Sequence, residues 1–187
     1  QHFDPRIGFK YYFENGFDLR AAMYANFAAA GMNQMYRSFV SGSSYTATNP
    51  ALRPQTNVGR EAGADLKSTW GEINFTVFSN QMRRYIDFAA LCTTAADCNN
   101  YIANTGLLQN TVTRVNQYVN AGDATLTGAE LMGSWNTPAK MFVLSSGVTA
   151  VKAYLTNTYH PTADPTGIQL GQVPRWTENG GVVEYHA

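Results

Sequence analysis

The chain has 187 residues, of which 44% are hydrophobic and 14% charged, and 13 basic residues balance 13 acidic ones. The balanced charge argues against an electrostatic nucleic-acid binder, which would carry a basic excess. The apolar content argues against disorder, and no apolar run approaches the ~18 residues of a transmembrane helix. A soluble all-β or mixed domain and a membrane β-barrel remain, because a barrel spreads its apolar residues along alternating strands.

The first two segments alternate with a period of two. Apolar side chains occupy the odd positions from Ile7 to Phe13 and from Phe17 to Phe27, and mostly polar or small side chains occupy the even positions. A helix would spread the odd positions around its whole circumference, so this pattern predicts strands. The pair Asn15 and Gly16 between the two segments is a strong hairpin signal.

The alternation continues further along the chain. In residues 58–67 the even positions are apolar, with Arg60 as the exception, and a short turn at Trp70 leads into a second alternating run that ends at Val77. Beyond Val77 the apolar positions change parity, which indicates a β-bulge or the end of the half-buried stretch.

Three more strands follow in the second half. They cover residues 124–135 and 140–152, and the last begins near Trp176. The sequence therefore predicts an all-β chain with about seven antiparallel strands.

The connections between these strands differ in length. The turns at 14–16, 68–71 and 136–139 are short, whereas those at 28–57, 89–110 and 154–174 are long and rich in Gly, Ser, Thr, Asn and Pro. Short periplasmic turns and long extracellular loops are typical of an outer-membrane barrel. Three long loops without secondary structure would count against a compact soluble domain. The pattern thus favours a segment of a large transmembrane β-barrel.

Large aromatic residues stand beside the short turns. Phe13 and Phe17 flank the first turn, Trp70 lies in the second, and Trp135 precedes the third. Aromatic rings with polar edges favour the membrane interface, where barrels carry aromatic girdles. The alternative is that these are turn-flanking core residues of a soluble β-sandwich.

Six short motifs resemble those of the TonB-dependent outer-membrane receptors and occur in the order of that family. Residues 49–56 resemble the family's NPxLxPE loop, and residues 120–122 with 128–131 resemble its N-x-G…G-x-E-L strand. Gln55 stands where the family usually has Glu, and Trp176 stands where His is common. The other matching segments are residues 32–37, 61–65, 70–80 and 172–175.

The resemblance implies a 22-stranded barrel filled by a plug domain, in the bacterial outer membrane. It implies uptake of a scarce nutrient, most often a ferric siderophore and sometimes cobalamin, haem or a glycan, with energy from the TonB complex. The barrel walls would do no covalent chemistry, so neither an enzyme nor a cofactor is expected.

We expect residues 1–187 to be part of such a barrel domain, with the plug, the TonB box and the terminal strands absent. Its partners would be outer-membrane lipid, the remaining strands and plug of the receptor, the TonB complex and a small-molecule metal chelate. The alternative is a soluble or surface-anchored β-sandwich that binds ligands, and detergent dependence separates the two.

Two groups of residues are candidates for ligand binding. Tyr36 with Arg37, and Arg83 and Arg84 with Tyr85, combine positive charge with an aromatic ring near the expected outer face. They could contact an anionic ligand such as a ferric chelate, or they could be ordinary loop and rim residues.

Cys92 and Cys98 lie in one expected loop, and we expect a disulfide between them, as suits a periplasmic or cell-surface compartment. Two free thiols are the alternative. A metal site is disfavoured because no second Cys or His pair lies nearby. His2, His160 and His186 are scattered and are assigned surface roles, although His160 and Asp164 share a loop and could touch a ligand.

A row of mixed charge is expected on the inward face of the barrel. Such a row would suit a lumen packed against a plug, although a solvated sheet face would look the same. Its members are Arg6, Lys10, Asp18, Arg20, Tyr24, Glu61, Asp65 and Lys67.

Overall fold

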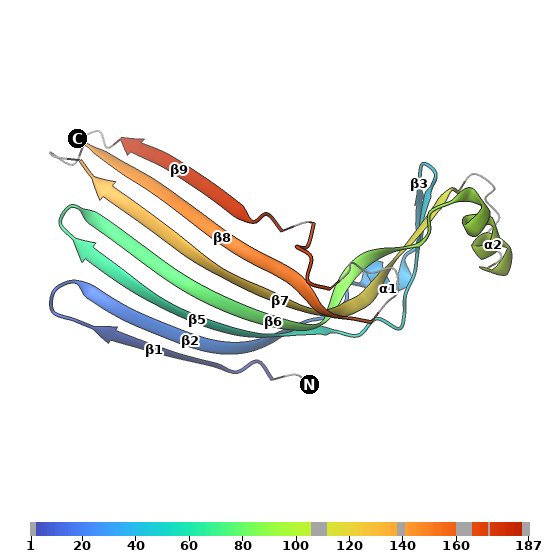
Figure 1. Ribbon diagram of the computed structural model, residues 1–187, viewed down its shortest axis with the longest axis horizontal. Helices are drawn as coiled ribbons and strands as arrows, with labels where there is room; N and C mark the ends of the chain where they lie inside the picture. Colours follow the sequence, from blue (N-terminus) through green and yellow to red (C-terminus); the bar gives the residue numbers. More distant parts are fainter. Residues whose placement is uncertain (1–2, 106–111, 138–140, 160–165, 172, 185–187) are drawn as a thin grey trace.

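Seven long strands form one open antiparallel sheet in this computed structural model, which describes residues 3–105, 112–137, 141–159, 166–171 and 173–184 (Figure 1). Each long strand pairs with the long strand that precedes it and the one that follows it along the chain. This confirms the predicted antiparallel strands. They are β1 (Arg6–Tyr12), β2 (Phe17–Ala28), β5 (Gln55–Ser68), β6 (Gly71–Cys92), β7 (Arg114–Asn136), β8 (Phe142–Thr158) and β9 (Trp176–Glu184).

The first hairpin is built as its sequence predicts. Gly16 adopts a φ of 79°, in the left-handed region that favours glycine. The backbone N–H of Phe13 donates to the carbonyl oxygen of Phe17 across the turn, at 2.9 Å. The carbonyl oxygen of Gly16 also accepts from the N–H of Lys67, at 2.8 Å, so β5 holds this turn in place.

Strands β6 and β7 are the longest, with 22 and 23 residues. About 9–11 tilted residues suffice to cross a bilayer, so both strands extend well beyond that length. The predicted bulge lies in β6, where the register to β7 shifts between Met82 and Ile86. Within it Arg84 has a φ of 57°, an uncommon value for a residue other than glycine.

The expectation that the long connections lack secondary structure is wrong for two of them. Residues 28–57 contain α1 (Met32–Tyr36), β3 (Phe39–Ser41) and β4 (Ser44–Ala47) before β5 begins. Residues 89–110 contain the end of β6 and α2 (Ala95–Thr105). Strand β4 pairs with β7 in parallel, unlike the long strands. The Asn116 side chain supports this pairing by donating to the Ser44 hydroxyl, at 2.8 Å.

One face of the seven long strands is apolar and bare. Its exposed side chains include Ile7, Phe9 and Phe75, with 73%, 63% and 44% of their surface accessible. We call it the apolar face, and the opposite side the polar face. No helix among the described residues is both long and apolar enough to cross a membrane.

The buried apolar clusters lie at the end of the sheet where β6 and β7 extend. One cluster joins Cys92, Cys98 and Val115 with Ala47 of β4. Another packs Leu170 against Leu155 and Ala153 of β8. The core is therefore at the long-loop end, and the apolar face packs against no second layer within the described chain.

Candidate functional site

The predicted row of mixed charge lies on the polar face. The register puts Lys10 opposite Arg20 and Asp18 opposite Asp65, so these four side chains share one side of β1, β2 and β5. Further along the same face the Arg6 guanidinium approaches the Glu61 carboxylate, at 4.0 Å, and Lys67 pairs with Glu72 at 3.5 Å.

Two buried carboxylates form the centre of this row. Asp18 is 7% exposed and Asp65 is 4% exposed. The Lys10 ammonium lies 3.3 Å from Asp18 and 3.4 Å from Asp65, and the Arg20 Nε donates to Asp65 at 3.1 Å. A buried charge is tolerated when it is paired and hydrogen-bonded. The two cations and two anions balance, and we call them the four-charge cluster.

Two side chains of β2 lie flat across glycines of β5. A Cβ atom on Gly59 would come 2.2 Å from Cζ of Tyr24, and one on Gly63 would come 2.8 Å from Cζ of Arg20. Arg20 also donates to the Thr76 hydroxyl, and the Tyr24 hydroxyl donates to Oδ1 of Asn80, at 3.1 Å. The glycines thus let the side chains reach β6 while staying close to the wall.

Asn120 on β7 joins the loop after β4 to the bulge of β6. Its Nδ2 donates to the carbonyl oxygens of Arg53 and Arg84, both at 2.9 Å. Its Oδ1 accepts from the N–H of Arg53, also at 2.9 Å. The sequence places Asn120 in the N-x-G…G-x-E-L motif, but it does not predict these hydrogen bonds.

The loop at residues 49–54 is fixed by its own motif residues. The Asn49 side chain donates to the carbonyl oxygen of Tyr118 at 2.8 Å, and Leu52 is buried. At the start of β5, Oε1 of Gln55 accepts from the N–H of Ile86 at 3.2 Å, which ties β5 to the bulge. A glutamate would accept there as well, so Gln55 preserves this contact.

A polar group involving Asp123 lies at the long-loop end. One oxygen of Asp123 accepts from the N–H of Arg84 at 3.2 Å, and the other accepts from the hydroxyl of Tyr159. The hydrogen bond to Asp123 raises the pKa of Tyr159, and burial and the Asp123 charge act in the same direction. The guanidinium groups of Arg83 and Arg84 oppose this shift, so both act electrostatically on Tyr159.

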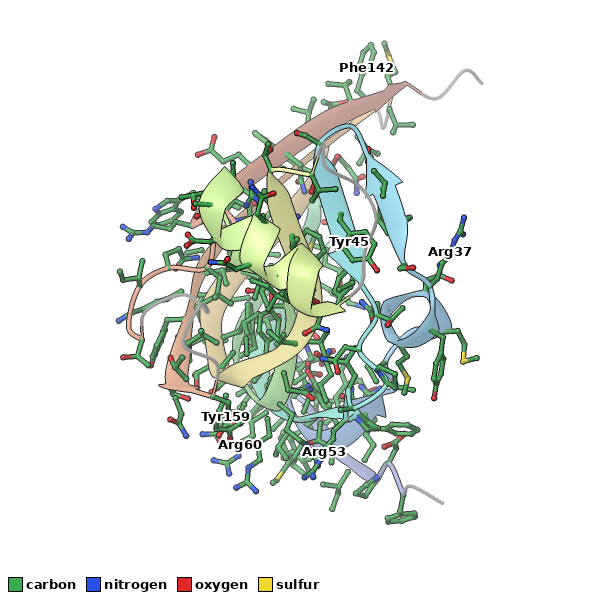
Figure 2. All side chains as sticks on the ribbon, turned by 90° about the vertical axis from the view of Figure 1, so that its right-hand side faces the viewer. Arg37, Tyr45, Arg53, Arg60, Phe142 and Tyr159 are labelled. Carbon is green, nitrogen blue, oxygen red and sulfur yellow. A yellow bond between two sulfur atoms is a disulfide. The ribbon has the colours of Figure 1, made fainter. Side chains whose placement is uncertain are left out.

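The residues predicted to bind ligand occupy two different elements. Tyr36 and Arg37 lie at the end of α1 and are exposed, and Figure 2 shows Arg37 well apart from Tyr159. Arg83 and Arg84 lie in the bulge of β6, whereas Tyr85 packs against two buried apolar clusters. Ligand binding by all five residues stays a prediction.

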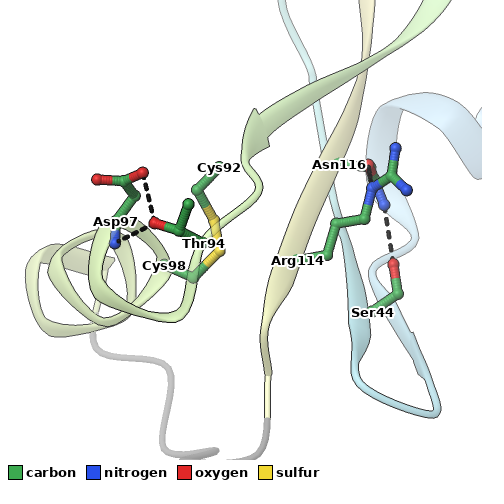
Figure 3. Close-up of a disulfide and its surroundings, with 7 residues drawn as sticks. All are labelled: Ser44, Cys92, Thr94, Asp97, Cys98, Arg114 and Asn116. Carbon is green, nitrogen blue, oxygen red and sulfur yellow. Dashed lines mark hydrogen bonds between the residues drawn. A yellow bond between two sulfur atoms is a disulfide. The ribbon is translucent and has the colours of Figure 1, made fainter.

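The structure has the expected disulfide between Cys92 and Cys98, whose Cα atoms are 5.3 Å apart (Figure 3). It ties the end of β6 to the first turn of α2, where the N–H of Asp97 donates to the Thr94 hydroxyl at 3.2 Å. Burial and the nearby Tyr45 raise the pKa of Tyr101 on this helix.

No group of three or more His, Cys, Asp or Glu in the described part of the chain could hold a metal ion. The surface roles expected for His2, His160 and His186, and the ligand contact considered for His160 and Asp164, fall outside the described residues. Lys140, where the expected strand at residues 140–152 begins, and Gln172 of the last motif also lie outside the described residues.

A comparison with protein families matches residues 1–187 to the family described as TonB dependent receptor-like, beta-barrel. The chain belongs to this family. TonB-dependent receptors are transporters rather than enzymes, and they sit in the bacterial outer membrane. The search of curated proteins finds no match.

Solved structures of TonB-dependent receptors share the fold. The copper transporter OprC matches at 11% identity over 97% of this chain and 24% of its own, with a TM-score of 0.66. The ferric enterobactin receptor PfeA of Pseudomonas aeruginosa, solved with enterobactin, matches at 16% identity over 96% and 25%, with a TM-score of 0.61. The FrpB iron transporter of Neisseria meningitidis matches at 15% identity over 98% and 24%, with a TM-score of 0.59.

The chain spans about a quarter of the length of these structures. Its sheet is a segment of a large transmembrane β-barrel, and its edges β1 and β9 are open. The soluble β-sandwich is not favoured, because a sandwich would cover the apolar face with a second sheet. Trp70 and Trp135 are 46% and 57% exposed, as girdle residues would be and core residues would not.

Proposed function

We propose that this chain is part of an outer-membrane receptor that imports a metal chelate, a ferric siderophore, with energy from the TonB complex. In this proposal the plug and the remaining barrel strands belong to the same receptor. The observation that carries the proposal is the family match over all 187 residues. The relatives named for iron or ferric enterobactin support the choice of an iron chelate.

The polar face suits the wall of such a barrel. Its four-charge cluster is neutral and internally paired, so it presents hydrogen-bonding groups to a plug without a large net field. On the same face, the side chains of Tyr24 and Arg20 lie flat across Gly59 and Gly63, which leaves space inside the barrel wall. A transport path through a barrel needs both properties.

The long-loop end suits initial capture of an anionic chelate. Arg83 and Arg84 bring two positive charges to one bulge, and Arg37, directly after α1, adds a third. Guanidinium groups pair well with anionic oxygen ligands, and an aromatic ring such as Tyr36 can stack on a planar chelate.

Uptake of radioactive iron tests the proposal. Cells that carry the complete receptor, in a host lacking its own ferric catecholate receptors, should accumulate iron-55 supplied as ferric enterobactin. Uptake should stop when the TonB gene is deleted or the proton gradient is collapsed. Uptake of copper but not of the ferric chelate would contradict the substrate, and uptake without TonB would contradict the energy source.

Replacement of Arg83 and Arg84 by glutamine tests the capture residues. Loss of both charges should weaken ferric enterobactin binding at least about tenfold, since even one charged hydrogen bond is worth about 1.5–3 kcal/mol. The matched control is Arg114→Gln, because Arg114 is exposed on β7 near β4. Equal effects of the double variant and the control would contradict the assignment.

A further inference from the structure

Arg60 is a charged residue on the apolar face. The register puts it opposite Met23 of β2 and Ser79 of β6, and Ile7 continues the same row on β1. Arg6, Lys10 and Arg20 on the polar face each have a carboxylate partner. The Arg60 side chain is exposed and has no hydrogen bond or ion pair with any described residue, and Figure 2 shows Arg60 at the margin of the molecule.

Arg60 lines a hollow on this face whose other lining residues are uncharged. The hollow has a volume of about 370 Å³. Ile7, Phe9, Ala21 and Met23 line it, and Ala21 contributes the smallest side chain of these four. A hollow of this shape, open on an apolar surface, fits a hydrocarbon chain.

The row that contains Arg60 is where the apolar face becomes polar. On β5 to β8 the row nearer the short turns contains only Ala62, Val77, Ala129 and Ala150. The next row towards the long loops contains Arg60, Ser79, Thr127 and Lys152, and we call it the boundary row. Guanidinium, ammonium and hydroxyl groups are all donors that suit an anionic oxygen ligand.

The boundary row lies at the height expected for lipid headgroups. Arg60 is ten residues from Trp70, and at about 3.3 Å per residue and a tilt of about 40° this corresponds to about 25 Å. The apolar band of such barrels is also about 25 Å tall. With Trp70 at one border, Arg60 therefore lies at the other, where a headgroup meets its acyl chains.

We propose that Arg60 and its hollow bind an anionic lipid of the surrounding membrane. The guanidinium pairs with a phosphate of the headgroup, and one acyl chain lies in the hollow between Ile7, Phe9 and Met23. This rests on the outer-membrane location proposed above, and it is independent of the transported substrate. Charge complementarity favours a lipid over a second protein, because an unpaired cation at headgroup height faces a layer rich in phosphate.

The test measures lipid retained by the complete receptor in mild detergent. Native mass spectrometry follows a titration with diphosphorylated lipid A, and separately with its dephosphorylated form. The wild type should retain lipid A more tightly than the dephosphorylated form. Arg60→Gln should weaken lipid A binding about tenfold, and Arg60→Lys should weaken it less than threefold because lysine still binds phosphate as a point charge.

Matched variants separate the site from general attraction. Arg53→Gln removes an exposed cation from the neighbouring loop, and it should leave lipid A binding unchanged. Ala21→Leu fills the hollow and should weaken binding without changing charge, whereas Ala64→Leu on the same face should not. Heat-dependent mobility on gels confirms that each variant is folded.

The proposal would be overturned if the Arg60→Gln variant bound lipid A as tightly as the wild type does. It would also be overturned if Arg53→Gln and Arg60→Gln lost lipid A binding equally, or if the wild type bound lipid A and its dephosphorylated form equally. Saturable binding of a protein partner that Arg60→Gln abolishes, with lipid A binding intact, would also overturn it. Failure of iron uptake with lipid binding intact would contradict the transport proposal alone.

Discussion

At the scale of single residues, Asp65 organises the polar face. It lies opposite Asp18, and like charges so close would repel each other without the cations above them. Lys10 reaches both carboxylates and Arg20 reaches Asp65, so three strands are joined through one buried anion. Because the two cations are about a third exposed, part of this attraction is screened by solvent.

Replacement of Asp65 by asparagine should destabilise the barrel by about 2–4 kcal/mol, because it removes the carboxylate that Arg20 contacts and one of the two that Lys10 contacts. The control is Lys67→Gln, which breaks an exposed ion pair and should cost under about 1 kcal/mol. Denaturant unfolding of the complete receptor, followed by gel mobility, measures both. A cost for Asp65→Asn no larger than that of the control would contradict a structural role for the cluster.

The pH dependence of Tyr159 is a second prediction at this scale. The phenol donates to Asp123 only when protonated, so its folded pKa is raised and the bond is present at neutral pH. This contribution is complete below about pH 10 and is lost as the pH rises through the raised pKa. Asp123→Asn should lower the pKa of Tyr159, because the opposing charges of Arg83 and Arg84 remain.

Ultraviolet difference titration measures this change, with Tyr159→Phe used to isolate the signal of one tyrosine. Asp123→Asn keeps an oxygen acceptor for the N–H of Arg84, so the bulge should persist. An unchanged or higher pKa of Tyr159 in the Asp123→Asn variant would show that Asp123 does not control it.

At the scale of elements, the bulge of β6 connects the barrel wall to the loop before β5. Asn120 makes three hydrogen bonds between Arg53 and Arg84, while Gln55 accepts from Ile86 on the other side of the bulge. These contacts fix the loop at residues 49–54 against β7. The bulge therefore marks the end of the wall, and it contains Arg83 and Arg84, which we propose as capture residues.

Asn120→Ala should release this loop. Three bonds to backbone groups are lost together, at about 1–3 kcal/mol for each group left unsatisfied. Hydrogen exchange at residues 48–54 should accelerate at least tenfold, while exchange in β2 stays unchanged. The control is Asn100→Ala on the exposed side of α2. Unchanged protection of residues 48–54 would contradict the connecting role of Asn120.

Period-two alternation predicts the elements only where one side of a strand is apolar. Ile7 to Phe27 and Val58 to Val77 carry that pattern, so the hairpin at Asn15 and Gly16 and the bulge after Val77 are found from the sequence. Beyond the bulge, β6 and β7 bury apolar residues such as Ala89 and Val119 in the clusters at the long-loop end, and the period-two pattern disappears. The parallel pairing of β4 depends on the contact of Ser44 with Asn116, 72 residues apart, which local sequence does not encode.

In the candidate site, too, the sequence predicts the residues that lie in an alternating pattern but not those that act through contacts far apart in the chain. The four-charge cluster was found because it stands on alternating positions, whereas Asn120 and Asp123 act through backbone groups far away in the chain. Tyr85 combines an aromatic ring with neighbouring arginines in sequence, but its own position is among apolar side chains.

At the scale of the whole molecule, the bare apolar face and the two open edges of the sheet determine which surroundings the folded chain needs. An exposed apolar surface this extensive needs lipid, and unpaired backbone groups on β1 and β9 need neighbouring strands. The buried clusters under α2 and Leu170 stabilise only the long-loop end. Lipid and further strands would together complete the structure.

Spin labels along β6 test the central claim most directly. Single cysteines at Ile73, Asn74, Phe75, Thr76 and Val77 of the complete receptor in liposomes are labelled, and their collision rates with oxygen and with a water-soluble nickel chelate are compared. If the apolar face is the lipid-facing wall of a barrel, labels at 73, 75 and 77 favour oxygen, as in lipid, while labels at 74 and 76 do not. Absence of this alternation, or nickel access at all five positions, would contradict a lipid-facing barrel wall.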